Sequence, residues 1–332
     1  HPHRAPWPVT LTVTTVPVLV GIPFEVDGEV VKTDATGTAR FTQEHNFGKH
    51  TLAVKRLTVV TPTQRYRFVR WAGQRDPDQA FRPEVTGLPM RASYTVTAGY
   101  AVEYPVTPRF TGTGGGPVAA DRIDAVSVRA DTGRILPLDP DAPTWLAGLT
   151  PVYRNSSLSL KRSAYTLQTV MVDGANVVDV GQQSFRPATR APVVFGTKFF
   201  DLTIRAHDAL FKHPIGEQAT VTYPNGTTRT ITLDAEHTAT LTDLPRGVYV
   251  VRLLGSGTSL PTQVTLSRNA AAELVVMSRV DLTTMALVGL TLAAGLLAMG
   301  RGRRRVRFVV SAAAQPIQRS VRRVRDTRDV TV

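Results

Sequence analysis

A run of nineteen uncharged residues near the C-terminus constrains this chain most. Leu282 to Gly300 reads LTTMALVGLTLAAGLLAMG. As an α-helix the run would be about 28 Å long, close to the hydrocarbon thickness of a bilayer. A buried globular helix is the other interpretation, and it is disfavoured because five arginines follow within seven residues. The sequence therefore predicts one transmembrane helix at 281–300, with residues 282–300 in contact with lipid.

The arginines after the run predict its orientation. Membrane-proximal basic residues gather on the cytoplasmic side of a span. Here they are Arg301, Arg303, Arg304, Arg305 and Arg307. The sequence thus predicts a single-pass protein of the cell membrane, with its N-terminal domains extracytoplasmic and residues 301–332 forming a cytoplasmic tail. Because the chain begins HPHRAP without an apolar leader, we expect that a signal peptide has been removed.

Most of the positive charge belongs to that tail. Residues 301–332 hold ten arginines and two aspartates, so they carry +8 of the net charge of +13. The rest is only mildly basic and contains no nucleic-acid-reading motif, so no specific nucleic-acid partner is expected. Anionic lipid headgroups are the expected partner of the tail. Ile317, Val321 and Val324 recur at helical spacing, which fits either an amphipathic helix on lipid or a disordered basic tail.

The residues before the run have the pattern of β-strands. Val9 to Val16 reads VTLTVTTV, which alternates apolar and polar positions, and turn residues such as Asp27-Gly28 follow at short intervals. The chain has no cysteine, so it is not a disulfide scaffold. This pattern predicts an all-β fold of tandem immunoglobulin-like β-sandwich modules followed by one transmembrane α-helix.

The spacing of turn and core residues in the first module resembles a known family. The residues concerned are Gly21, Pro23, Val26 to Gly28, Thr33, Asp34, Gly37, Ala39, Phe41, Gly48, His50, Leu52 and Val54. This order is similar to the carboxypeptidase-regulatory-like and PEGA-like immunoglobulin-type modules of microbial surface proteins. A second copy is expected at 199–277, with a hairpin at Asn225-Gly226. There His237 stands where glycine is expected, which predicts a wider turn.

Four β modules are expected before the helix. They are a β-sandwich module at 1–60, a small β module at 61–110, a β-rich module at 111–195 and a second β-sandwich module at 196–279. In the small module, Arg65 to Trp71 and Ala98 to Tyr100 resemble internalin-type B-repeats. The glycine-rich stretch Gly112 to Pro117 predicts a flexible linker before the third module.

No catalytic constellation is visible in the sequence. P-loop, HExxH and GxSxG patterns are all absent, and no cofactor is predicted. The weak candidates for a metal site are His1, His3, His45 and His50. An exposed His1 amine with imidazoles would suit copper, whereas a frayed terminus with solvated histidines is the favoured interpretation. Asp76-Pro77-Asp78 and Asp139-Pro140-Asp141 fit calcium ligands less well than ordinary turns.

Two further surfaces are candidates for binding. In an extended strand Arg65, Arg67 and Trp71 share one face, and with Arg70 they form a possible surface for a glycan or an acidic polymer. The alternative is that Tyr66 and Phe68 are core residues and the arginines are only a solvated face. In the predicted span, Ala286, Gly289 and Ala293 share a helix face, and such small residues let two helices pack closely, so a protein partner in the membrane or envelope is also possible.

The sequence thus favours a non-catalytic, membrane-anchored extracytoplasmic surface protein acting as a binding or scaffold module. One alternative is an accessory subunit of an integral membrane complex for transport, secretion or envelope assembly. The other is an envelope enzyme with an unrecognised site.

Overall fold

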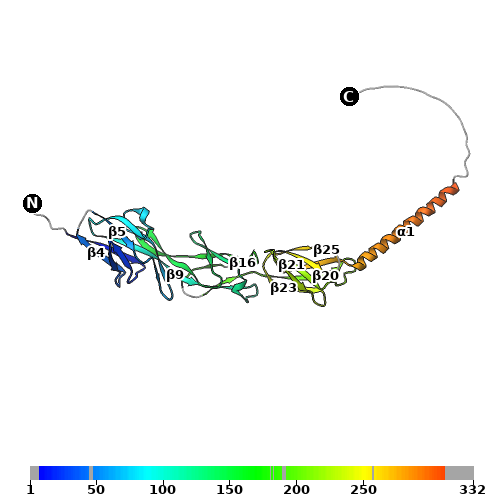
Figure 1. Ribbon diagram of the computed structural model, residues 1–332, viewed down its shortest axis with the longest axis horizontal. Helices are drawn as coiled ribbons and strands as arrows, with labels where there is room; N and C mark the ends of the chain where they lie inside the picture. Colours follow the sequence, from blue (N-terminus) through cyan, green and yellow to red (C-terminus); the bar gives the residue numbers. More distant parts are fainter. Residues whose placement is uncertain are drawn as a thin grey trace, which may run out of the picture.

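The molecule is a rod of β modules that ends in a long helix. The computed structural model describes residues 7–44, 48–179, 181, 183–188, 192–255 and 258–310. The modules follow one another along the rod, with the N-terminus at the end far from the helix (Figure 1). Three separate buried hydrophobic clusters lie within residues 9–100, 106–199 and 202–276. The predicted all-β class with one C-terminal apolar helix is confirmed.

The first module packs two sheets on one core. One sheet contains β1 (Pro8–Val16), β4 (Thr38–Glu44), β6 (Thr58–Val60), β7 (Arg65–Ala72) and β9 (Tyr94–Val106). The other contains β2 (Pro23–Val26), β3 (Glu29–Lys32), β5 (Lys49–Val54) and β8 (Glu84–Pro89). A short 3-10 helix, η1 (Pro77–Gln79), lies between β7 and β8. The alternation in β1 points Val9, Leu11 and Val13 into the core.

The structure forms one module where the sequence suggested separate modules at 1–60 and 61–110. β1 pairs in parallel with β9, from Leu11 opposite Tyr94 to Val16 opposite Gly99. β7 pairs with the other edge of β9 and shares the same buried cluster. The pairing of β1 with β9 joins segments more than eighty residues apart, which local spacing does not reveal.

The third module repeats the topology of the first. Its strands are β20 (Phe200–Asp208), β21 (Gln218–Thr222), β22 (Thr228–Thr232), β23 (Thr238–Leu244), β24 (Gly247–Leu254), β25 (Thr258–Ser259), β26 (Thr262–Leu266) and β27 (Ala270–Met277). The first strand again pairs antiparallel with the fourth, β20 with β23, and in parallel with the last, β20 with β27. The second copy predicted at 199–277 therefore has the strand arrangement of the first module, although in the first module β8 and β9 lie outside the predicted bounds of 1–60.

The turn at His237 is no wider than its counterpart, contrary to the prediction. In both copies the aspartate side chain caps the turn, because Asp34 Oδ1 accepts from the Thr38 amide and Asp234 Oδ1 from the Thr238 amide. Gly37 has φ +73° and His237 has φ +55°, so the histidine adopts the left-handed conformation that glycine occupies in the first copy. Its ring Nδ1 is hydrogen-bonded to the carbonyl of Gly216.

The middle module contains two smaller sheets and a connecting hairpin. One sheet is β10 (Pro108–Thr111), β11 (Pro117–Val118) and β19 (Val193–Gly196); the other is β12 (Ala125–Ala130), β13 (Ile135–Leu138), β16 (Tyr165–Val172), β17 (Ala175–Asn176) and β18 (Ser184–Phe185), with η2 (Ala120–Arg122) before it. The glycine-rich stretch is not a linker. The Gly112 amide donates to the Gly116 carbonyl, which closes a hairpin between β10 and β11 inside the module.

One long strand joins the first two modules. β7 lies along one edge of β9, and the other edge pairs first with β1 and then with β14 (Thr144–Arg154), which continues into β15 (Ser157–Arg162). The sheet of the first module therefore extends into the second. The second and third modules meet through single hydrogen bonds, including one from Arg246 Nε to the carbonyl of Asn176.

The helix α1 (Arg279–Val310) follows two residues after β27. Its segment Arg279–Met299 is long and apolar enough to cross a membrane. An eighteen-residue apolar stretch of this segment has a mean hydropathy of 2.0, and none of that stretch is buried against the rest of the protein. The structure thus continues the helix beyond the predicted end at residue 300.

Candidate functional site

The predicted ligand surface on β7 is rearranged by a β-bulge. Phe68 lies opposite Tyr100 and Arg70 lies opposite Gly99, so Val69 is an extra residue without a cross-strand partner. After the bulge the alternation of faces is reversed. Trp71 is therefore fully buried, with its ring 5.1 Å from that of Phe68, and its indole N–H donates to the carbonyl of Arg82. Trp71 is a core residue, and the prediction that it belongs to an exposed ligand surface is wrong.

Arg65 and Arg67 converge on one buried carboxylate. Glu103 on β9 has a side chain that is only 4% exposed, and its Oε1 lies 2.8 Å from Arg67 Nε. Its Oε2 lies 2.5 Å from Arg65 Nη2. The Arg65 guanidinium also lies over the ring of Trp145, 5.2 Å from its centroid. These two arginines therefore neutralise a buried charge where β9 passes from the first module to the second, which limits their availability to a ligand.

Arg70 is the predicted residue that remains at an accessible aromatic surface. Its guanidinium lies 4.9 Å from the ring centroid of Phe81 and 5.2 Å from that of Tyr153. Phe81 is 64% exposed and Tyr153 is 45% exposed. We call these three residues the arginine–aromatic patch. Two rings and a cation in one exposed group can stack on a sugar ring or on a planar acidic ligand.

The predicted histidine and aspartate sites lie elsewhere or have structural roles. His1, His3 and His45 lie outside the described residues. His50 is mostly buried and its Nδ1 lies 2.5 Å from Asp27 Oδ2. Burial acts to raise the pKa of Asp27, but its hydrogen bonds with the His50 ring and the Thr51 amide lower that pKa below its usual value.

The two Asp-Pro-Asp motifs form turns, as the favoured interpretation predicted. Asp76 Oδ1 accepts from the amide of Asp78 at the start of η1. Asp139 Oδ1 accepts from the amides of Asp141 and Ala142. Within the described residues, His, Asp and Glu side chains form no cluster of three or more that could hold a metal ion.

The base of the rod contains a junction that the sequence did not indicate. Asp281, in the first turn of α1, is fully buried, and its Oδ2 accepts from the amides of Ser278 at 3.0 Å and Ala209 at 3.2 Å. The Asp281 amide in turn bonds to Ser278 Oγ at 3.1 Å. This carboxylate therefore caps the helix and fastens its first turn to the loop after β20.

The predicted helix-contact residues are exposed on α1. Ala286, Gly289 and Ala293 are all exposed, and no atom of another part of the chain lies within 4 Å of a side chain added at Gly289. The side chains of the five membrane-proximal arginines lie outside the described residues, although their backbone continues α1.

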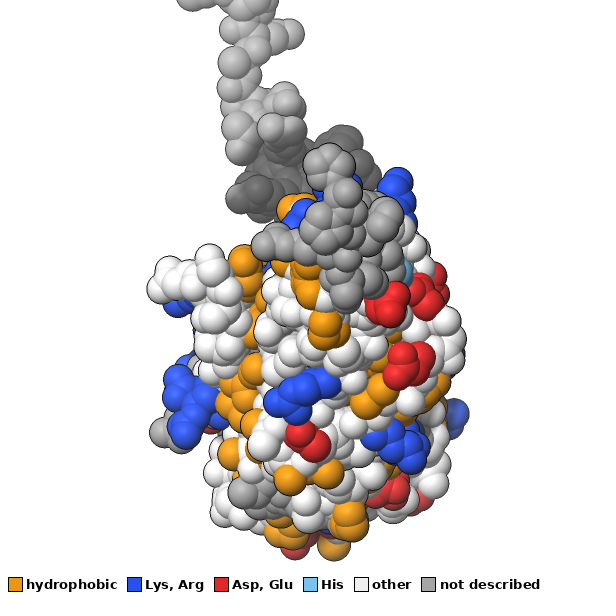
Figure 2. Space-filling view, turned by 90° about the vertical axis from the view of Figure 1, so that its left-hand side faces the viewer, with side chains coloured by type: hydrophobic (Ala, Val, Ile, Leu, Met, Phe, Trp, Pro, Cys, Tyr) orange, Lys and Arg blue, Asp and Glu red, His pale blue; other side chains and the backbone are white. Residues whose placement is uncertain are grey.

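At the opposite end of the rod, apolar, basic and acidic side chains are mixed. Figure 2 looks onto this N-terminal end, and no one type of side chain covers the described surface. We therefore assign no ligand type to this end of the rod.

Known proteins resemble this chain only distantly. No protein-family model matches the sequence, and no curated protein matches it. Among solved structures, the Bacillus anthracis TIE protein is 11% identical with a TM-score of 0.32, over 82% of this chain and 51% of that one. BcpA, the major pilin subunit of Bacillus cereus, is 13% identical with a TM-score of 0.23, over 82% of this chain and 98% of BcpA. A streptococcal ancillary pilin is 11% identical with a TM-score of 0.26, over 82% of this chain and 100% of the pilin.

The alignment with the TIE protein thus covers about half of that chain. At such identities and TM-scores, these structures assign neither an activity nor a ligand to this protein.

Proposed function

We propose that this chain is a single-pass membrane protein whose three modules form a non-catalytic binding or scaffold rod outside the cytoplasm. The observation that carries the proposal is the exposed apolar helix. The eighteen-residue apolar stretch of α1 has a mean hydropathy of 2.0, and none of it is buried. Water would be a poor solvent for so much apolar surface, whereas lipid hydrocarbon is a good one. The arginines after residue 300 favour a cytoplasmic C-terminus.

The joints of the rod support a scaffold role. β9 is shared between the sheets of the first two modules, and Asp281 fastens α1 to the third. These connections restrict bending at two of the three joints of the rod, and the first module lies at the end of the rod far from α1 (Figure 1). The arginine–aromatic patch of Arg70, Phe81 and Tyr153 is the exposed group best suited to bind a partner there, with a glycan as the proposed ligand class.

Membrane extraction tests this function. The full chain, expressed with an export signal, should stay in the membrane pellet after alkaline carbonate and dissolve only in detergent. A chain ending at Ser278 should be soluble and folded, because each module has its own buried cluster. Release of the full chain by carbonate would contradict the proposal.

A second candidate, an accessory subunit of a membrane complex, is favoured by the small residues of α1. Ala286, Gly289 and Ala293 are exposed and offer a close approach to another helix. Purification of the full chain in mild detergent distinguishes the two functions. A stoichiometric integral-membrane partner that is lost in Gly289→Leu favours the accessory subunit, and a chain without such a partner favours the independent rod.

A further inference from the structure

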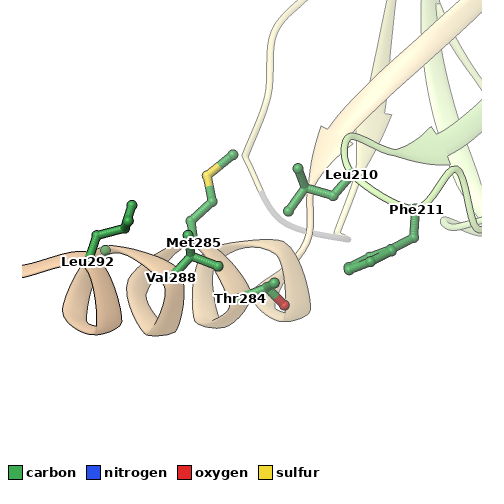
Figure 3. A pocket seen from close by; sticks show the side chains of 7 residues that line it. Leu210, Phe211, Thr284, Met285, Val288 and Leu292 are labelled. Atoms are coloured by element: carbon green, nitrogen blue, oxygen red, sulfur yellow. The ribbon is translucent and has the colours of Figure 1, made fainter. Parts of the chain in front are cut away.

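An apolar groove lies between the base of the third module and the helix. Its volume is about 510 Å³, and its walls are Leu210, Phe211, Thr284, Met285, Val288, Gly289 and Leu292. Leu210 and Phe211 come from the loop after β20, and both extend from the module beside the first turns of α1 (Figure 3). Leu210 is 43% exposed and Phe211 is 51% exposed. Two adjacent large apolar side chains are therefore presented next to the apolar helix.

The loop holds these side chains outward by a network of buried acceptors. Asp208 is 5% exposed, and its Oδ1 accepts from the Phe211 amide at 2.9 Å and from the His213 amide at 3.2 Å. The Asp208 amide donates to the His213 carbonyl at 2.9 Å, which closes the loop. At the start of the loop, the Ala209 amide donates to the carboxylate of Asp281 in α1. The backbone is thus fixed on both sides of Leu210 and Phe211, and their exposure is built into the loop.

We propose that the Leu210–Phe211 loop is a second membrane contact of this protein, and that the groove beside α1 takes an acyl chain of a phospholipid in the extracytoplasmic leaflet. This inference rests on the proposed function, because it requires α1 to span the bilayer. The loop lies beside Thr284 and Met285, five and six residues after the first residue of α1. That is about 8 Å along a helix axis, a depth typical of the boundary between headgroups and acyl chains.

Two features favour lipid over a partner helix as the occupant. The groove is continuous with the apolar surface of α1, and the rest of the chain does not bury the apolar stretch of this helix. Hydrocarbon that covers α1 therefore also reaches the groove. Exposed Lys212 follows Phe211 directly in the loop and adds a cation to that lip of the groove. This cation complements a lipid phosphate above an acyl chain.

Single-cysteine spin labelling tests the inference, because the chain has no cysteine of its own. The full chain carrying Phe211→Cys is labelled, reconstituted into vesicles of phosphatidylcholine and phosphatidylglycerol, and exposed to oxygen, which partitions into lipid, or to a water-soluble nickel chelate. Leu210→Cys is a second site in case Phe211→Cys folds poorly. Val248→Cys is the matched control, since Val248 is 41% exposed at the opposite end of the same module.

The loop label should show a ratio of oxygen to nickel accessibility several-fold above that of the Val248 label. Equal ratios at the two sites would overturn the inference. Low accessibility to both reagents would also overturn it, because that result means protein, not lipid, covers the groove. A Leu290→Cys label in α1 separates this failure from failure of the proposed function. A lipid-exposed label at 290 with a water-exposed label at 211 rejects the loop contact alone, whereas a water-exposed label at 290 rejects the span.

Discussion

The buried carboxylate of Glu103 should be essential to the stability of the first two modules. Glu103→Gln keeps the size of the side chain but removes the charge that Arg65 and Arg67 neutralise. A hydrogen bond to a charged group contributes about 1.5–3 kcal/mol, and loss of one partner of a fully buried ion pair costs about 3–5 kcal/mol. Arg65 and Arg67 are 28% and 50% exposed, so water hydrates them in part and the cost is reduced. We therefore expect the free energy of unfolding to fall by about 2 kcal/mol.

Urea unfolding followed by tryptophan fluorescence measures this change. All three tryptophans, Trp7, Trp71 and Trp145, lie in the first two modules, so the signal reports the part of the rod that contains Glu103. With a slope of about 2 kcal/mol per molar urea, the midpoint should fall by about 1 M. Glu84→Gln removes an exposed carboxylate from β8 and should leave the midpoint nearly unchanged. If Glu103→Gln unfolds at the wild-type midpoint, the arginines do not serve the buried charge and the ligand-surface interpretation of β7 regains support.

Three other outcomes can be measured by the same unfolding assay. Trp71→Ala should lower the free energy of unfolding by about 3–5 kcal/mol because it empties a core position, whereas Phe81→Ala, at an exposed ring, should lower it far less. Comparable losses of stability would contradict the claim that the bulge places Trp71 in the core. The hydrogen bond from the Thr36 side chain is the largest cause of the lowered pKa of Asp34, and the bond from the Thr38 amide is the next. The contribution of Asp34 to the free energy of unfolding is therefore complete above pH about 4 and is lost as the pH falls towards the folded-state pKa. Asp34→Asn should make the free energy of unfolding fall less steeply at acid pH, and an unchanged pH dependence of that free energy would refute the role of the cap. Gly37→Ala should destabilise more than Gly28→Ala in the same module, since a Cβ at Gly37 would lie 2.8 Å from Thr15 Oγ1 and one at Gly28 would meet nothing within 4 Å; the reverse order would contradict this account of the turn.

The sequence predicted the features that depend on local spacing. Alternation in Val9 to Val16 gives a strand with one buried face, and the predicted turns at Asp27-Gly28 and Asn225-Gly226 join β2 to β3 and β21 to β22. The apolar run after Asp281 forms a helix as expected. In each case the information lies within a few consecutive residues, so the sequence alone is sufficient.

The errors arise where a single local event changes the geometry or where distant segments meet. One extra residue at Val69 reversed the faces of β7 and moved Trp71 into the core. The hairpin at Gly112 and the parallel pairing of β1 with β9 depend on partners that spacing does not identify. Glu103 did give a sequence signal, as the lone charge in the strand YTVTAGYAVEYPV, and a lone charge in such a strand predicts an opposite charge on a neighbouring strand.

Topology in intact cells tests the central claim most directly. Because the chain lacks cysteine, single cysteines at Val194, which is 62% exposed in the middle module, and at Ser311, after the described part of α1, can each be labelled alone. A membrane-impermeant maleimide should label Val194→Cys in intact cells and Ser311→Cys only after the membrane is permeabilised. Labelling of Ser311→Cys in intact cells, with Val194→Cys protected, would show that the rod faces the cytoplasm and would contradict the account.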